Sequence, residues 1–273
     1  MKNLNSIFRR VLGIGLLSLA FFGCQEMDRP EFGDYPIDIN QPGGPLKFYV
    51  PFDDNTTDPL KFAVDNIRAK FPSDNPLVPT EGITGKGVKG GVAKKFIAYS
   101  SANDFAATAS SMTIAFWAKH DAPTQTEFAF TLTADDHWAK ASMFLLLEGS
   151  VASPVMKLMV DDQNGDKWFE WVGGNSVPGI YDNQWHHLAF VYNATTSIMT
   201  CYKDGVAYLP NSQWDNHGSI KFKTSKINGF RIGGSGNPDE GWMNSYTGSL
   251  DNFRLYNTPL SSAEVQNLFT EKK

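Results

Sequence analysis

From position 47 onward, apolar residues occur in short runs that are separated by turn residues. The runs are rich in aromatic and β-branched side chains, which favour β-strands. The run at 112–119 is apolar at both its odd and its even positions, so both faces of this strand should be buried. We therefore expect it in the middle of a sheet, with Trp117 buried. The spacing is typical of an antiparallel sandwich. The clearest predicted strands are 112–119, 142–147, 155–160, 168–172, 187–192, 198–203, 230–232 and 249–256.

Two dipeptides mark tight turns between these strands. Asn164-Gly165 separates the strands at 155–160 and 168–172, and Asp204-Gly205 follows the strand at 198–203. Both dipeptides favour turns that need a positive φ angle. Each therefore predicts a β-hairpin.

The carboxyl-terminal segment carries a helix signal. Ser261 and Glu264 have the spacing of a capping box, and an apolar stripe follows at Val265, Leu268 and Phe269. We expect this helix to close one edge or end of the sandwich. The segment 55–73 lies between prolines and has only a partial helical period, so it predicts a loop with at most a short helix.

The first 23 residues have the pattern of an export signal. Basic residues at positions 2, 9 and 10 precede the apolar run 11–22, which is too short to cross a bilayer, and Gly23 and Cys24 follow. The end of the run resembles the lipobox of bacterial lipoproteins, which implies cleavage before Cys24 and acylation of its thiol. A secreted protein with an accidental cysteine is the alternative.

The residues after Cys24 refine this interpretation. An acidic stretch at 25–28 resembles the surface-export signal of some outer-membrane lipoproteins, although an ordinary tether would have a similar composition. Four prolines and three glycines between 29 and 46 favour an extended spacer. We therefore expect a signal peptide at 1–23, an acylated tether at 24–46, one domain at 47–273, and a lipid-anchored location on the outer membrane, facing the cell exterior.

Composition narrows the class of domain. The chain is 41% hydrophobic and 13% aromatic, with 24 glycines and 15 prolines, which suits a large core with many turns. A net charge of −5 without a basic cluster argues against nucleic acid as a partner. If Cys24 carries lipid, Cys201 is the one remaining thiol, so packing rather than a disulfide holds the core.

Five segments in order resemble the laminin G-like domains of the concanavalin A-like lectin/glucanase superfamily. This resemblance implies an all-β, antiparallel jelly-roll sandwich with a short carboxyl-terminal helix. It extends upstream to 48–58, 85–91 and 112–119, and so covers nearly the whole predicted domain. The five segments are QWHHLAFVYN at 184–193, YKDG at 202–205, FRIGG at 230–234, GSLDNFRLYN at 248–257 and PLSSAE at 259–264.

The family contains both lectins and glycan hydrolases, so the fold does not decide the function. Hydrolysis usually needs two carboxyl groups across a sugar site, and laminarinase-like members supply them from a Glu-x-Asp-x-x-Glu strand. The chain contains no such run. We therefore predict a carbohydrate-binding domain that assists polysaccharide capture, with a protein-interaction module and a hydrolase with unfamiliar acids as alternatives.

Three tryptophans lie in polar, turn-rich segments: Trp138, Trp214 and Trp242. Such a ring either plugs one end of a sandwich or offers a platform on which a sugar ring stacks. Asn244 and Tyr246 lie beside Trp242 and complete the set of candidate ligand-binding residues. Both interpretations stay open at each position.

Alternation along strands separates two further pairs of residues. His186 and His187 would project to opposite faces, so they cannot readily bind one metal ion and are predicted to be structural. Trp168 and Trp171 would also lie on opposite faces of one strand. At most one of these two tryptophans is therefore expected in the main core.

Asp251 raises the possibility of a metal site. Counting by two places it on the same face as Phe253, and a carboxylate that faces a core needs a partner. Backbone N–H groups, Arg231, or a calcium ion could supply one. Many jelly-roll binding domains hold a structural calcium ion in such a position, and here Asp53 and Asp54 would be its further ligands.

Overall fold

The computed structural model describes residues 43–53, 77–91, 95–133, 138–234 and 242–272. The predicted signal, Cys24, Asp54 and the predicted loop at 55–73 lie outside the described residues. None of the helices in the described ranges combines the length and the apolar character that a membrane crossing requires.

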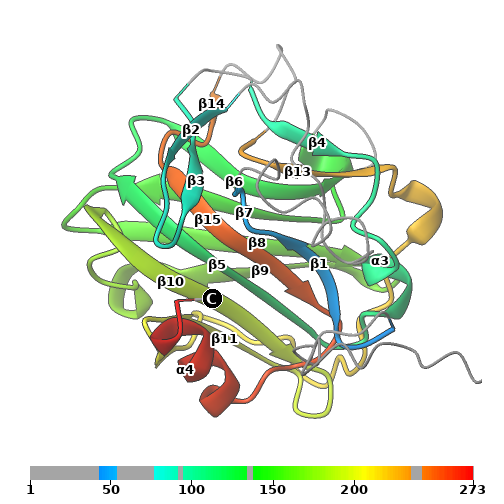
Figure 1. Cartoon of the computed structure of the whole chain (residues 1–273). Helices are drawn as coiled ribbons and strands as arrows, with labels where there is room; N and C mark the ends of the chain where they lie inside the picture. Colours follow the sequence, from blue (N-terminus) through cyan, green and yellow to red (C-terminus); the bar gives the residue numbers. More distant parts are fainter. Residues whose placement is uncertain (1–42, 54–76, 92–94, 134–137, 235–241, 273) are drawn as a thin grey trace, which may run out of the picture. The chain divides into compact units, whose positions relative to one another are not determined.

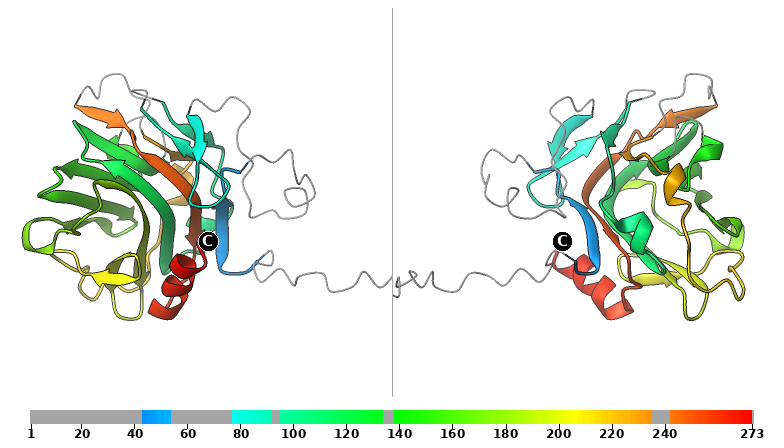
Figure 2. Two further views of the ribbon diagram at one scale, coloured as in Figure 1. Left: turned by 60° about the vertical axis from the view of Figure 1, so that its left-hand side comes forward. Right: turned by 90° about the vertical axis from the view of Figure 1, so that its right-hand side faces the viewer.

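Two sheets form the domain, as the antiparallel pattern predicts (Figure 1). In sheet A the order is β12-β11-β10-β5-β15-β3-β2, and β1 also pairs with β15. Figure 2 shows β1 in blue beside the orange-red β15. The strands of sheet A are β1 (Leu46–Val50), β2 (Val78–Glu81), β3 (Lys86–Lys89), β5 (Met112–Asp121), β10 (Asp182–Asn193), β11 (Ile198–Lys203), β12 (Val206–Tyr208) and β15 (Ser249–Tyr256).

Sheet B has the order β4-β13-β6-β7-β8-β9. The short strand β14 (Met243–Ser245) pairs with β6 in the parallel sense, whereas the other pairs of this sheet are antiparallel. The remaining strands of sheet B are β4 (Ile97–Tyr99), β6 (Thr126–Thr133), β7 (Met143–Gly149), β8 (Pro154–Asp162), β9 (Gly165–Trp171) and β13 (Gly229–Ile232).

Both predicted hairpins are confirmed. The strand β8 ends at Asp162 and β9 begins at Gly165, whose φ angle is 120°. Asp204 and Gly205 connect β11 to β12 with φ angles of 52° and 80°. Positive φ is the reason that glycine occupies the first turn, and aspartate and glycine the second.

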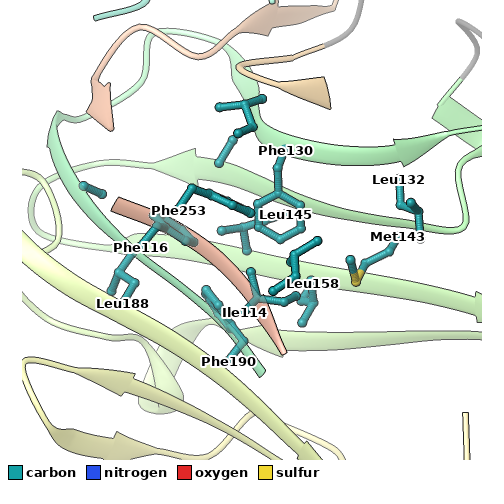
Figure 3. Close-up of a cluster of buried hydrophobic side chains, with 14 of the residues drawn as sticks. Ile114, Phe116, Phe130, Leu132, Met143, Leu145, Leu158, Leu188, Phe190 and Phe253 are labelled. Carbon is teal, nitrogen blue, oxygen red and sulfur yellow. The ribbon is translucent and has the colours of Figure 1, made fainter. Parts of the chain in front are cut away.

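The inner faces of the two sheets meet in the main core, part of which is drawn in Figure 3. Phe253 of β15 lies between Phe116 of β5 and Phe130 of β6, with ring centroids 5.3 and 5.4 Å away. Aliphatic side chains such as Leu145 and Leu158 fill the space around these rings. Burying each such side chain stabilises the fold by roughly 1.5 to 3 kcal/mol, so packing alone can hold the sandwich.

The predicted carboxyl-terminal helix is present as α4 (Ser262–Thr270), with the capping box between Ser261 and Glu264. It covers the outer face of sheet A rather than an edge or end, because Val265 packs against small residues of β5 and β10. Trp117 is buried, as expected, but it lies on this outer face, 5.8 Å from the ring of Phe269. The other short helices within the described ranges are α3 (Phe105–Thr108), η1 (Trp138–Lys140), η2 (Gly173–Asn175) and η3 (Thr224–Lys226).

Candidate functional site

The outer face of sheet B carries an unusually apolar row of side chains. The strand register aligns Thr131, Phe144, Met159 and Trp168 across β6, β7, β8 and β9. Their neighbours in sequence point into the main core, so alternation directs these four outward. Phe144 and Met159 are nevertheless buried, which means that other groups cover this face.

Three indole rings provide that cover. Trp138 of η1 and Trp168 of β9 pack against Phe144, with centroids 6.4 and 5.4 Å from its ring. Trp242 lies edge-to-face on Trp138, at 6.1 Å and 87°. We call Trp138, Trp168 and Trp242 the tryptophan cluster. Trp242 is 48% exposed, and the other two rings are partly exposed, so the cluster presents aromatic surface to solvent on a rigid base.

Polar groups border the tryptophan cluster. Asp166 accepts a hydrogen bond from the indole Nε1 of Trp168, at 3.0 Å. In the next row of β8, the ammonium group of Lys157 lies 2.9 Å from Glu148 and 4.0 Å from Glu170. Carboxylates beside aromatic rings can accept hydrogen bonds from sugar hydroxyl groups while the rings stack on the sugar.

A buried carboxylate fixes the segment that carries Trp242. Glu127 is fully buried on β6, and its two oxygens accept from the backbone N–H and the hydroxyl of Thr247, both at 2.8 Å. His120 also bonds to Glu127, at 2.8 Å. The pairing of β14 with β6 and this anchor at Thr247 hold the chain that directly follows Trp242.

The structure brings together two of the three predicted tryptophans, Trp138 and Trp242. Trp214 lies apart, because its ring packs against Phe169 and Tyr192 of the main core and stacks on His217 at 3.4 Å. Its surroundings favour the plug interpretation over the platform interpretation.

Two other candidates also differ from the sequence prediction. Tyr246 is only 1% exposed and donates its hydroxyl to the carbonyl of Ser249, so its ring faces the core and is not available to a ligand from solvent. Asn244 lies on β14 opposite Glu127, and its side chain is outside the described part of the chain.

Sequence reasoning did not select Trp168 as a candidate for ligand binding. Trp168 and Trp171 do lie on opposite faces of β9, as predicted, and Trp171 is the one in the main core. The alternation of side chains along the strand could have identified Trp168. Alternation places Trp168 on the outer face of the hairpin, opposite Met159, and two large apolar side chains on an outer face imply that other groups cover it.

The prediction that Asp251 shares a face with Phe253 is wrong. A bulge between Asp251 and Arg254 interrupts the pairing of β15 with β5, and Asn252 adopts a φ angle of 51°. The extra residue breaks the alternation, so Phe253 enters the core while Asp251 lies opposite Trp117 on the outer face.

Asp251 faces the turn between β2 and β3. Its Oδ2 accepts from the backbone N–H groups of Ile83 and Thr84 at 2.8 and 3.3 Å, which is one of the predicted alternatives. Its Oδ1 is buried and has no hydrogen-bond partner among the described atoms. A Cβ atom on Gly82 would overlap Oδ2, and one on Gly85 would overlap Oδ1 of Asp53.

Two of the three predicted calcium ligands, Asp251 and Asp53, therefore converge on one turn. Burial, together with the nearby charge of Asp53, raises the pKa of Asp251 to about 7, against the pull of its backbone hydrogen bonds. A hard cation would favour the ionised form and engage the orphaned oxygen, so the donors suit calcium. In the described part of the chain, no three His, Cys, Asp or Glu side chains gather as a metal site, so backbone oxygens or Asp54 would have to complete it.

The adjacent histidines have different environments, as alternation predicts. His186 lies between two carboxylates, 2.6 Å from Asp204 and 3.0 Å from Asp182. His187 is fully buried against Trp117, with ring centroids 5.4 Å apart.

The fold agrees with the comparison to protein families. Residues 96–266 match the Laminin_G_3 family, described as the concanavalin A-like lectin/glucanases superfamily. The match spans more than half of the chain, so the protein belongs to this family. No curated protein matches the chain.

Solved structures with this fold include sugar-related and toxin domains. Domain 4 of AbnA, an extracellular arabinanase of Geobacillus stearothermophilus solved with arabinotriose, has a TM-score of 0.50 and 17% identity, covering 82% of this chain and 97% of its own. The binding domain of Paraclostridial Mosquitocidal Protein 1 has a TM-score of 0.51 and 15% identity, and the match covers 77% of this chain and 49% of that one. At these identities the likeness concerns the fold alone.

Proposed function

We propose that this protein is a lipid-anchored, carbohydrate-binding protein of the cell surface, and that the tryptophan cluster is its binding face. The observation that carries the proposal is the exposed ring of Trp242, supported by Trp138 on the buried base around Phe144. Sugars stack on such rings because their C–H faces are apolar, and a rigid platform loses little entropy on binding. The arabinotriose complex of the AbnA domain supports a sugar ligand by analogy of fold.

The same face argues for binding over hydrolysis. Glu148 and Glu170 lie on either side of Lys157, within 2.9 and 4.0 Å of its ammonium group. A hydrolase needs the space between its two carboxyl groups for the glycosidic oxygen or a water molecule. Lys157 occupies that space here.

A panel of neutral and charged polysaccharides, titrated calorimetrically against the full-length protein, tests the proposal. We expect Trp242→Ala to weaken binding by about 1 to 3 kcal/mol with an unchanged melting temperature, because the lost contact is on the surface. Trp214→Ala is the matched control and should lower stability by about 2 kcal/mol or more, because its ring packs on the core. A wild-type protein that binds no polysaccharide would remove the lectin hypothesis and favour the protein-interaction module.

The location on the outer membrane is part of the proposal. It rests on the lipobox-like end of the apolar run at Cys24 and on the acidic residues that follow. A lipid at Cys24 would tether the domain through the spacer at 29–46 and leave the binding face available to polymers outside the cell.

A structural calcium ion at Asp251 and Asp53 completes the proposal. The buried, unpartnered Oδ1 of Asp251 supports it, because a buried carboxylate oxygen without a partner is costly. When bound, calcium would neutralise the two carboxylates, and the turn between β2 and β3 would be held against β15.

A further inference from the structure

The lysines beside the tryptophan cluster are already paired within the protein. Lys157 forms ion pairs with Glu148 and Glu170, as described above. Lys223 places its ammonium group 3.0 and 3.2 Å from the two oxygens of Asp161, which projects outward from β8. These cations are therefore not available to a ligand without breaking an existing contact.

The other cations near the cluster are also engaged. The guanidinium group of Arg231 lies 4.4 Å above the ring of Phe96. Lys140 follows Trp138 on η1 and likewise has an interaction within the protein. Recognition of an anionic sugar usually requires a cation that can form a direct, charge-assisted hydrogen bond. Among the described residues of this face, each such cation has a partner.

Carboxylates add negative charge close to the rings. Asp166 lies against Trp168 and forms no ion pair with a lysine or arginine of the described residues, and Glu170 is 4.0 Å from the ammonium group of Lys157. A ligand with carboxylate or sulfate groups would be repelled.

We infer that the tryptophan cluster selects uncharged polysaccharides and rejects uronate-containing or sulfated ones, with Glu148 and Glu170 as the residues that determine this specificity by neutralising Lys157. The inference rests on the proposed function, because it names the ligand class of the same face. The carboxylates can accept hydrogen bonds from the hydroxyl groups of a neutral sugar. An anionic sugar finds no free cation on this face and is repelled by the carboxylates.

The test compares polysaccharides that share a backbone and differ in charge. Highly methyl-esterified homogalacturonan is paired with polygalacturonate, and carboxyl-reduced hyaluronan is paired with hyaluronan. Each is immobilised, and binding of the full-length protein in detergent is measured by interferometry. We expect the uncharged member of a pair to bind at least tenfold more tightly, and the ratio to shrink in about 0.5 M salt, because salt screens repulsion but not stacking.

The specificity residues are tested by E148Q/E170Q, which keeps both side-chain shapes and frees Lys157. This variant should reduce the ratio to threefold or less by raising affinity for the charged member. Glu81→Gln on the exposed strand β2 of sheet A is the matched control and should leave the ratio unchanged.

Each outcome is decisive. Equal binding of both members, or preference for the charged one, overturns the inference and leaves the proposed function standing. A ratio that E148Q/E170Q does not change also overturns it. If no member of either pair and no other neutral polysaccharide binds, the proposed function fails and the inference fails with it.

Discussion

At the scale of single residues, His187 is a titratable group that the fold buries without a hydrogen-bond partner among the described residues. Burial, and then the nearby charge of Arg254, lower its pKa to about 3. The folded protein therefore holds this histidine in its neutral form across the physiological range.

This burial predicts acid sensitivity. In the unfolded chain His187 takes up a proton near pH 6.5, whereas in the folded protein it does so near pH 3. Between these values the unfolded state binds more protons, so stability falls as the pH falls, by up to about 1.4 kcal/mol per pH unit. Chemical denaturation of wild type and of His187→Leu from pH 7 to pH 4 measures this, and we expect a shallower loss in the variant.

His186 supplies a control of opposite sign. Its hydrogen bond to Asp204, and a second one to Asp182, raise its pKa, although burial opposes them. Its contribution to stability is therefore present below its unfolded pKa and lost as the pH rises through the folded pKa. His186→Gln should lose stability mainly at acidic pH. Parallel pH profiles for the two variants would contradict the different environments described here.

The calcium ion proposed at Asp251 would link stability to pH. Because the folded pKa of Asp251 is raised to about 7, the folded state without metal holds a proton that the unfolded state releases near pH 4, so stability falls as the pH rises from 4 to 7. Calcium should reverse this loss by favouring the carboxylate. We expect calcium to raise the melting temperature of wild type more at pH 8 than at pH 5.

Asp251→Asn tests this site directly. The amide oxygen can still accept from Ile83 and Thr84, so the variant should fold, but its melting temperature should not respond to calcium. In a chelator at pH 8 the variant should be at least as stable as wild type, since it buries no charge. A wild-type melting temperature that is the same with calcium and with chelator would exclude the metal.

At the scale of elements, the bulge in β15 marks where sequence reasoning failed. The strand at 249–256 was predicted to the residue, but the face of Asp251 was not. Counting by two assumes a regular strand, and one extra residue at Asn252 reverses every later side chain. Asparagine tolerates a positive φ angle, so Asn252 is a weak sequence signal for the bulge.

The presence and the cap of helix α4 were likewise predicted correctly, but its position was not. The apolar stripe of α4 indicated that one face of the helix is buried. The surface that buries it is the shallow area around Ala115 and Ala189 on sheet A. Small residues at facing positions of two paired strands leave room for a helix to pack. These two alanines can be recognised as such a surface only when the register between β5 and β10 is known.

Trp117 connects this helix to sheet A and allows a stability prediction. Its ring is 2% exposed beneath Phe269 and beside His187. Trp117→Ala should cost about 3 to 5 kcal/mol because it leaves a cavity between α4 and the sheet. Denaturant unfolding measures the loss, and Trp185→Ala, at a half-buried position of β10, is expected to cost less. A change below about 1 kcal/mol at Trp117 would show that the helix does not depend on this contact.

At the scale of the whole molecule, the sandwich was predictable because its strands have strong local patterns and the motif series at 184–264 is specific. The tryptophan cluster was only partly predictable. Trp138, Trp168 and Trp242 are far apart in sequence, and only the order of strands in sheet B brings them together. Trp214 has similar neighbours in sequence but lies against the core.

The anchor is tested on the whole protein. If Cys24 is acylated, wild type should partition into detergent and its mass should include acyl chains, whereas Cys24→Ala should be released or mislocalised. Phase partition and intact mass spectrometry measure both. A mature membrane-bound protein with an unmodified Cys24 would contradict the lipoprotein proposal.

The pairing of β1 with β15 also constrains the order in which the sandwich can form. Phe48 and Val50 lie opposite Leu255 and Phe253, so the first strand of the sandwich needs the last one as its partner. At translation rates of about 5 to 20 residues per second, roughly 10 to 40 s separate the appearance of these two strands from the ribosome. During that interval the apolar side of β1 has no partner strand, and the earliest strand made is among the last to be hydrogen-bonded.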